Sequence, residues 1–249
     1  MLSSFFKRVA SSRWFYAIGL PLWVLIVFLT VEVVVSLAYL GVHTLLVGSI
    51  DESIATVIVS VAVYGLALLA ILGLPWLIGK RRTTLADLGL QRLPTWLDIV
   101  WAVAGVVGYV ILTAIITGIS FFVLPFVDPN QAQDTGFPSV LNSFEYILAF
   151  ICLVVLAPIA EETLFRGYLF GKLKKHISVW LSVVLTSLLF GFVHFQWNVS
   201  IDVFALSLVL CFLRVSTDSI WASVLVHMAK NGLAFYLLFI NPALLSTLG

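Results

Sequence analysis

The chain has 249 residues, of which 62% are hydrophobic and only 10% are charged. Soluble globular domains are about 45–50% apolar and about 25% charged. This composition, with a mean hydropathy of +1.15, therefore indicates an integral membrane protein without a sizeable soluble domain. The formal net charge of +1 argues against a nucleic-acid partner. Cys152 and Cys211 both lie in apolar runs, which excludes a disulfide framework and a thiolate zinc site.

The apolar segments predict an all-α, polytopic transmembrane helix bundle with about seven spans, since a spanning helix needs about 20 mostly apolar residues. Residues 1–249 are interpreted as one membrane domain. The sixth span is short and needs its flanks to lengthen it. Between the spans, Thr83–Thr95 predicts an interfacial amphipathic helix, which would be an eighth helix, and Asp128–Phe144 predicts an external loop. In chain order, the spans are Trp14–Val42, Ile54–Ile78, Leu97–Val127, Phe144–Phe170, Ile177–Phe195, Ile201–Leu213 and Ser219–Ile240.

The basic residues orient this arrangement. Apart from Arg166 and Lys230, which lie within spans, every Lys and Arg precedes the first span or follows the second, fourth or sixth. Loops enriched in Lys and Arg are cytoplasmic. The sequence therefore predicts a multi-pass protein of the cell membrane, with the N-terminus in the cytoplasm and the C-terminus outside.

The fourth span contains two adjacent carboxylates, Glu161 and Glu162. The apolar run Tyr146–Ala160 that precedes them is about 22 Å long as a helix, which is short for a hydrocarbon core of about 30 Å. The crossing is complete only if the helix continues to Phe170, so both glutamates are expected inside the membrane, just after a kink at Pro158. Because an ionisable group there costs roughly 2.5 to 3.5 kcal/mol or more, we expect it to be used.

Helical spacing separates the roles of the two glutamates. Glu162 and Arg166 are four residues apart and therefore share a helix face, which predicts an ion pair. Glu161 is rotated by about 100° from Glu162 and stays available as a base. Taken alone, this motif is explained equally well by a functional site and by an ion pair that only fixes helix packing.

Two later apolar segments add His194 and, on one helix face, His227 and Asn231. Counted from the cytoplasmic basic residues, Glu161 and His227 lie at a similar depth, roughly 19 Å along their helices. His194 is nominally deeper, so helix tilt or a late helix start has to bring it level. The sequence thus predicts that these four side chains converge on one cavity.

Glu, His and Asn side chains at membrane depth suit hydrolysis. Glu161 would take a proton from water, a histidine would orient that water or protonate the leaving amine, and His227 and Asn231 would donate to an oxyanion. A zinc ion held by Glu161, His194 and His227 is an equal alternative. The residues leave the metal-bound and the metal-free water both open.

Three motifs taken together resemble the CAAX protease and bacteriocin-processing family of intramembrane endopeptidases, which includes type II CAAX prenyl proteases. The motifs are Glu161-Glu162-x-x-x-Arg166, Phe190-x-x-x-His194 and His227-x-x-x-Asn231, and the resemblance covers residues 97–240, the family-like catalytic core. It implies a cavity open to the cytoplasm and hydrolysis of a membrane-associated peptide or protein held in the lipid bilayer. It further implies that Glu161 is the base with His194 as its partner.

The same resemblance implies that His227 and Asn231 stabilise the oxyanion, and that Glu162 and Arg166 support the first motif. Both metal-dependent and metal-free mechanisms are compatible with the family. Phe190 is interpreted as a cavity wall or a packing residue. Two other functions remain open: an ion- or proton-coupled transporter, in which buried Glu and His relay ions, and a catalytically silent membrane scaffold.

Four further charged residues lie within or near the predicted spans. Asp202 and Asp218 lie near the ends of predicted spans, which favours interfacial caps over an aspartyl catalytic pair. Lys230 immediately precedes Asn231 and is therefore expected to point off the catalytic face. The alternatives for it are snorkelling, a pair with Glu32 of the first span, or lining the cavity, and a structural role is favoured. Glu32 is either that partner or a functional group in its own right.

Overall fold

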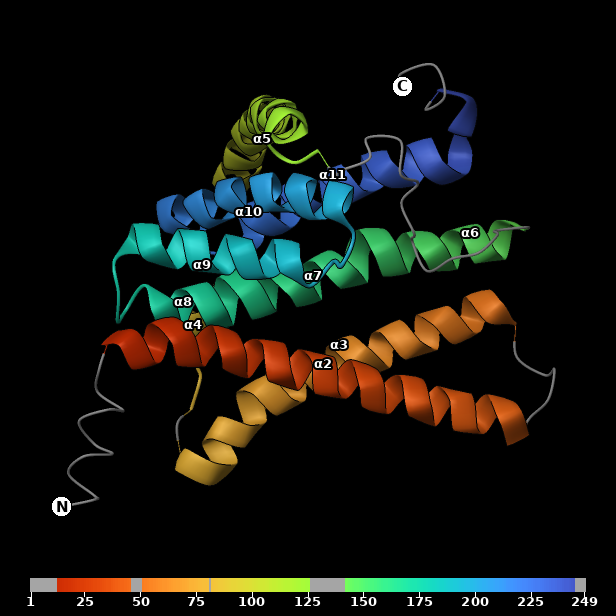
Figure 1. Cartoon of the computed structure of the whole chain (residues 1–249), viewed down its shortest axis with the longest axis horizontal. Coiled ribbons are helices and arrows are strands. Elements are labelled where there is room, and N and C mark those ends of the chain that lie inside the picture. The colour runs from red at the N-terminus through yellow and green to blue at the C-terminus, as the bar shows by residue number, and fades with distance from the viewer. Residues whose placement is uncertain (1–12, 46–50, 81, 126–141, 245–249) are drawn as a thin grey trace.

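The computed structural model describes residues 13–45, 51–80, 82–125 and 142–244, and they form a polytopic helical bundle without strands (Figure 1). The predicted fold class is thereby confirmed. The first half of the chain contributes α2 (Arg13–Leu45), α3 (Glu52–Gly79), the short α4 (Leu85–Leu88) and α5 (Trp96–Val123). The second half contributes a composite central helix, then α9 (Val179–Phe192), α10 (Trp197–Thr217), α11 (Trp221–Phe235) and the π-helical η3 (Tyr236–Ile240).

Six helices are long and apolar enough to cross a membrane, and α9 is a shorter apolar helix. The fifth predicted span is therefore corrected: α9 has 14 residues, or about 21 Å at 1.5 Å per residue. It stops there because the chain turns sharply, with Phe195 in the left-handed region at a φ of 53°. The turn also gives α10 an early start, so the sixth span, predicted as short, is a helix of 21 residues.

The fourth predicted span is one composite helix, Ser143–Leu173, which we call the central helix. It comprises α6 (Ser143–Phe150), η1 (Ile151–Leu156), α7 (Ala157–Glu162), η2 (Thr163–Phe170) and α8 (Gly171–Leu173), where η denotes π-helical hydrogen bonding. The π-helical segment η1 ends two residues before Pro158, which lies in the first turn of α7. The kink predicted at Pro158 stays a prediction. π-Helical turns inside α-helices are frequent at functional sites. Here they flank both glutamates, which lie within the span as predicted.

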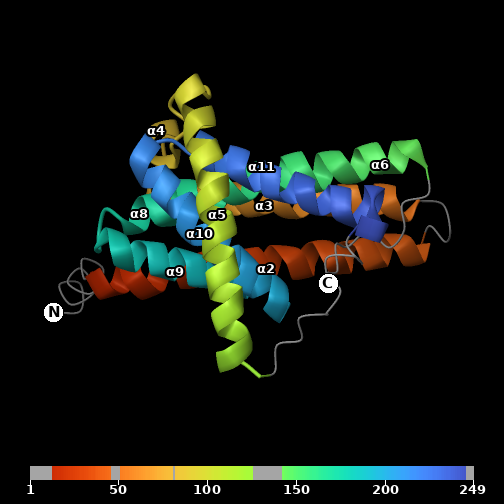
Figure 2. The same ribbon diagram turned by 90° about the horizontal axis from the view of Figure 1, so that it is seen from above.

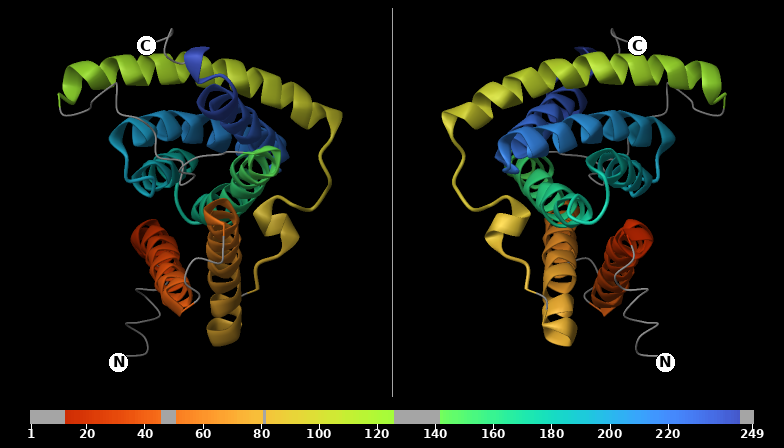
Figure 3. Two further views of the ribbon diagram at one scale, coloured as in Figure 1. Left: turned by 90° about the vertical axis from the view of Figure 1, so that its right-hand side faces the viewer. Right: turned by 90° about the vertical axis from the view of Figure 1, so that its left-hand side faces the viewer.

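The helices pack on both sides of the central helix. Figure 3 shows α2 and α3 on one side of it and α10, α11 and α5 on the other. In Figure 2, α5 runs across the direction of α2 and the central helix, and it contacts α10 and α11. Gly105 permits this close crossing, since a Cβ there would lie 2.8 Å from side-chain atoms of Leu213 and Val226. The predicted orientation of the termini is not decided by this packing and stays a prediction.

The predicted interfacial segment is mostly not helical. Only α4 forms in it, and Leu88 is buried in the core instead of lying on a membrane surface. Two glycines of the central helix make room for it: a Cβ at Gly167 would lie 2.9 Å from the Leu88 carbonyl oxygen, and one at Gly171 would lie 2.8 Å from that of Asp87. The segment therefore docks on the central helix. Residues 128–141 of the predicted external loop lie outside the described residues.

Candidate active site

The residues of the three motifs meet at a cavity of about 170 Å³ inside the bundle. Glu161 reaches it from α7, His227 and Asn231 reach it from α11, and His194 reaches it from the turn between α9 and α10. The structure thus brings the four predicted catalytic residues together, while the chemical role of each remains a prediction. Two further polar side chains, Tyr64 and Lys230, line the cavity with the apolar residues Leu153, Ala157, Val199, Val203, Ala234, Phe235, Leu238 and Phe239.

Below the cavity, Glu162 and Arg166 form the predicted ion pair. Both side chains are fully buried, and Arg166 Nη1 lies 2.8 Å from Glu162 Oε1. The same carboxylate oxygen lies 2.9 Å from His227 Nδ1, a contact that the spacing of Glu162 and Arg166 did not reveal. Because a carboxylate only accepts hydrogen bonds, Nδ1 carries a proton. In the neutral ring Nε2 then holds a lone pair, and it lies 3.8 Å from Glu161 Oε2.

His194 is oriented in a similar way, although not where the sequence placed it. It lies beyond Val193, the C-cap of α9, and is therefore in the turn and not inside a spanning helix. Its Nδ1 lies 2.7 Å from the carbonyl oxygen of Phe190. A carbonyl oxygen only accepts, so Nδ1 is again the protonated nitrogen and Nε2 of the neutral ring is the acceptor. Both histidines of the cavity thus have their Nδ1 atoms engaged by the protein.

Phe190 is a packing residue at the base of this arrangement. It is fully buried, and its ring centre lies 5.1 Å from that of His194 and 5.8 Å from that of His227. The guanidinium carbon of Arg166 lies 4.3 Å from the same ring centre. One aromatic ring therefore fixes the spacing of both histidines and covers the buried cation, a contact that is favourable for a desolvated guanidinium.

Tyr64 of α3 is a site residue that the sequence analysis missed. Its hydroxyl donates to Glu161 Oε1 at 2.6 Å. The second span offered no motif, so only one signal was available: a tyrosine in the middle of an apolar helix needs an acceptor for its hydroxyl when it is buried. The sequence does not indicate which residue accepts the hydrogen bond from this hydroxyl.

Lys230 and Asp202 correct two predictions. Lys230 lines the cavity instead of pointing away from the site, and its Nζ lies 3.3 Å from Asp202 Oδ2. Asp202 is not an interfacial cap: it lies inside α10 and also accepts from Tyr109 at 2.6 Å and from Thr113 at 2.9 Å. These contacts arise because α5, α10 and α11 pack together. Glu32, exposed on α2, does not pair with Lys230.

The other aspartate behaves as predicted. Asp218 caps the C-terminus of α10 with a left-handed backbone, 2.8 Å from Arg214 Nη1 and 3.5 Å from Lys174 Nζ. These cations lower the pKa of its carboxyl group, against the opposing effect of its partial burial, which is the larger single influence. Asp218 therefore belongs to the rim of the bundle and takes no part in the cavity.

Asn231 connects the cavity to the irregular part of the central helix. Its side-chain Nδ2 donates to the carbonyl oxygen of Leu153 at 2.9 Å. Leu153 belongs to η1, where π-helical bonding redirects backbone carbonyls. An amide nitrogen carries two N–H groups, so one of them holds η1 while the other can serve a ligand. The predicted oxyanion role of Asn231 is compatible with this geometry.

The predicted zinc alternative stays a prediction. The part of the chain that the structure describes contains no group of three His, Cys, Asp or Glu residues placed to hold a metal ion. Glu161, His194 and His227 share the cavity, and Glu161 Oε1 accepts from Tyr64. We therefore assign no step of the chemistry to a metal.

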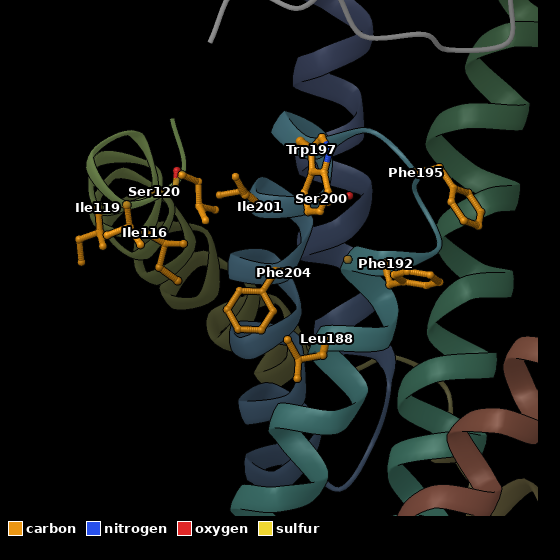
Figure 4. Close-up of a pocket in the computed structure, with 13 residues that line it drawn as sticks. Ile116, Ile119, Ser120, Leu188, Phe192, Phe195, Trp197, Ser200, Ile201 and Phe204 are labelled. Atoms are coloured by element: carbon orange, nitrogen blue, oxygen red, sulfur yellow. The ribbon is translucent and has the colours of Figure 1, made fainter. Parts of the chain in front are cut away.

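A larger cavity of about 610 Å³ lies on another face of α10 (Figure 4). It holds no charged residue, and its polar side chains are Ser120, Ser200 and Trp197. None of these is an acid or base near neutral pH. The remaining lining residues are Ile116, Ile119, Val123, Leu124, Leu188, Gly191, Phe192, Phe195, Ile201 and Phe204. We call it the apolar cavity, and the chemistry of its lining excludes it as the site of proton transfer.

Residues 143–233 match the family model described as type II CAAX prenyl endopeptidase Rce1-like. This segment contains the central helix and all three motifs. The similarity to the Rce1-like family covers this segment, which is less than half of the chain. The match confirms the resemblance given by the motif residues, and at the level of the family it supports a CAAX-type intramembrane protease. Neither the substrate nor the type of catalysis follows from it.

Three relatives show how far this similarity extends. The chain is 26% identical over 142 residues to the "Putative membrane peptidase YdiL" of Bacillus subtilis, which covers 57% of each protein. It is 25% identical over 168 residues to the "UPF0177 protein YxdF" of Lactococcus lactis, covering 67% of the chain and 88% of that protein. An "Uncharacterized 24.3 kDa protein" of Escherichia coli is 31% identical over 94 residues, which is 43% of its length. No solved structure matches the chain.

Proposed function

We propose that the protein is an intramembrane endopeptidase that hydrolyses a peptide bond of a membrane-associated substrate with a water activated by Glu161. The observation that carries the proposal is the position of Glu161 Oε2, 3.8 Å from His227 Nε2 at the edge of a small polar cavity inside the bundle. A water bound beside both atoms can donate a hydrogen bond to each of them. The Rce1-like match of the same segment supports this class of enzyme.

In the proposed reaction Glu161 Oε2 takes one proton of the water as its oxygen bonds to the carbonyl carbon of the substrate. The carbonyl oxygen becomes an oxyanion, and the second N–H of Asn231 and the ammonium group of Lys230 are the donors that line the cavity for it. When the C–N bond breaks, the proton passes from Glu161 to the leaving amine, directly or through His194. Carboxylic acid and amine products then leave with the atoms of one water added.

Glu162 and Arg166 act on this reaction through His227. The hydrogen bond to Glu162 keeps Nδ1 of His227 protonated, so the neutral ring accepts at Nε2 and helps to hold the water. A neutral His227 cannot donate to an oxyanion. The oxyanion role implied by the family resemblance therefore requires the protonated ring, whereas water orientation requires the neutral one.

The test is a cleavage assay with the full-length protein in liposomes and a membrane-anchored peptide. Glu161→Gln keeps the size and most hydrogen bonds of the side chain but cannot take the proton, so cleavage should fall by about 10² or more. Glu145→Gln is the matched control, because Glu145 lies on the same central helix but outside the cavity, and it should cleave like the wild type. Full activity of Glu161→Gln would refute the proposal, and ion flux through the same liposomes would then test a transporter.

The same assay separates the two waters that the sequence left open. His194→Ala and His227→Ala join Glu161→Gln, and each protein is measured as purified, after a chelator and after added zinc. A metal-free water is supported if all three variants lose activity and the chelator does not affect cleavage by the wild type. Wild-type activity that is lost on chelation and restored by zinc supports a histidine-bound metal instead.

A further inference from the structure

Among the described residues that line the active-site cavity, Tyr64 alone comes from the chain before the central helix. It lies on α3, outside the segment that matches the Rce1-like family. We infer that Tyr64 is a positioning residue of the proposed reaction, which holds the Glu161 carboxylate so that Oε2, and not Oε1, receives the proton of the water. This inference rests on the proposed function.

The two oxygens of Glu161 have different surroundings. Oε1 accepts the Tyr64 hydroxyl at 2.6 Å, whereas Oε2 faces Nε2 of His227. A proton delivered to Oε1 would compete with the hydroxyl hydrogen already bonded there. In the proposed step the O–H bond of the water breaks, its proton moves to Oε2 and its oxygen bonds to the carbonyl carbon. Tyr64 keeps its own proton throughout.

Without the hydrogen bond from Tyr64, the Glu161 side chain has little preference for which of its two oxygens faces the water. The last torsion of a glutamate is broad and roughly two-fold, so its carboxylate rotates easily between arrangements that exchange the two oxygens. Tyr64 is well placed to prevent this, since α3 contacts both α7 and η1 of the central helix and Ala67, one turn further along α3, is buried. The helix that carries the phenol ring is therefore fixed against the central helix that carries Glu161.

A structural interpretation has to be separated from this one, because the same hydrogen bond also ties α3 to the central helix. The pH dependence of the maximal rate separates them, since only a donor that acts on the reacting carboxylate changes it. The substitution Tyr64→Phe leaves the other titratable groups around Glu161 in place. These are Glu162 on the central helix, His194 in the α9–α10 turn, and His227 and Lys230 on α11, while Cys152 and Glu32 act on Tyr64 itself.

The experiment compares Tyr64→Phe with Tyr109→Phe in the liposome assay. Tyr109 is a matched control because its hydroxyl also makes a 2.6 Å hydrogen bond to a carboxylate, that of Asp202. For Tyr64→Phe we expect kcat to fall about tenfold, the loss expected for one hydrogen bond to a charged group, with KM within about twofold of the wild type. The acidic limb of its kcat profile should move to higher pH, because the charged carboxylate loses a donor. Tyr109→Phe should keep the pH profile of the wild type, because its hydroxyl bonds to Asp202 and not to Glu161.

A fluorinated tyrosine at position 64 provides a second measurement that does not depend on the folding of the Phe variant. It keeps the ring and the hydroxyl but makes the hydroxyl a stronger donor, so the acidic limb should move to lower pH. An unchanged pH profile in both position-64 variants would overturn the inference and leave Tyr64 as a structural tie. If Glu161→Gln is inactive in that case, only the inference about Tyr64 fails. If Glu161→Gln is active, the proposed function itself fails.

Discussion

Two cavities adjoin α10, and they differ in every respect that matters for chemistry. The smaller, of about 170 Å³, contains two histidines, a glutamate, a lysine, an asparagine and a tyrosine. The apolar cavity, of about 610 Å³, has two serines and a tryptophan as its polar side chains. A search by volume would select the second, yet proton transfer requires groups that titrate. The candidate site is therefore identified by its acid–base groups and not by its volume.

The two cavities also differ in what supports them. Beneath the active-site cavity, the fully buried pair of Glu162 and Arg166 connects the central helix to His227 on α11. Charges in such a place are strongly destabilising unless they are paired and hydrogen bonded. The walls of the apolar cavity carry no charge, so single substitutions there leave no buried charge behind. Substitutions at the buried pair should therefore cost more unfolding free energy than substitutions in the apolar cavity.

The largest effect on stability is expected for Arg166→Ala. It leaves Glu162 as a buried charge without its arginine partner, and breaking a buried pair in this way costs about 3–5 kcal/mol of unfolding free energy. Reversible unfolding in detergent measures the loss. The double variant Glu162→Gln/Arg166→Met should recover a large part of it, because both charges are then absent. A loss for Arg166→Ala no larger than about 1 kcal/mol would show that the pair is not the structural support described here.

A smaller effect is expected for Asp202→Asn, beside the same cavity. The amide can keep a hydrogen bond from Tyr109 or Thr113 but removes the negative charge 3.3 Å from Lys230 Nζ. Hydrogen bonds to charged groups contribute roughly 1.5–3 kcal/mol, so we expect a loss of about 2 kcal/mol in the same unfolding measurement. Thr113→Val is the control, which removes one hydrogen bond and no charge and should lose about 1 kcal/mol. Equal losses would mean that the charge of Asp202 is unimportant.

Next comes a polar substitution in the apolar cavity. Ser200→Ala removes one of its two hydroxyl groups, and we expect the unfolding free energy to change by no more than about 0.5 kcal/mol. Peptide cleavage in liposomes should be the same as for the wild type. A tenfold loss of kcat in this variant would break the comparison, since it would give the apolar cavity a chemical role.

A stability effect that depends on pH is expected at the bundle surface, where Lys175 Nζ lies 2.5 Å from Asp87 Oδ1. The hydrogen bond from Lys175, followed by those from Thr84, lowers the pKa of Asp87 below its ordinary 3.8. A depressed pKa stabilises the fold above the ordinary value and loses this effect as the pH falls toward the folded-state pKa. Because the pair is half exposed, Asp87→Asn should cost at most about 1 kcal/mol at neutral pH. The difference from the wild type should shrink below about pH 4; a difference that grew there would contradict the assignment.

Much of the architecture could be predicted because it depends on local properties of the chain. Apolar length and the cost of burying backbone polar groups predict spanning helices. Helical periodicity then places Glu162 with Arg166 and His227 with Asn231. The ion pair of Glu162 and Arg166 was predicted in this way, and so was the position of both glutamates inside the central helix. The errors at α9 and at the segment Thr83–Thr95 arose where a turn or tertiary packing ended a helix.

The contacts of the site were decided by the tertiary structure alone. Tyr64 and Glu161 are 97 residues apart, and Glu162 and His227 are 65 apart, so no periodicity relates them. The protonated nitrogen of His227 follows from an acceptor on another helix, Glu162, and the inward position of Lys230 follows from Asp202 on α10. The protonated nitrogen of His194, by contrast, follows from the local carbonyl of Phe190. The sequence by itself determined that Glu161, Glu162 and His227 lie on helices long and apolar enough to cross a membrane, because apolar length is a property of the segment that carries them. The tertiary structure determined what each of them faces, because hydrogen bonds require atoms within about 3 Å, and only the packing of separate helices brings such atoms together.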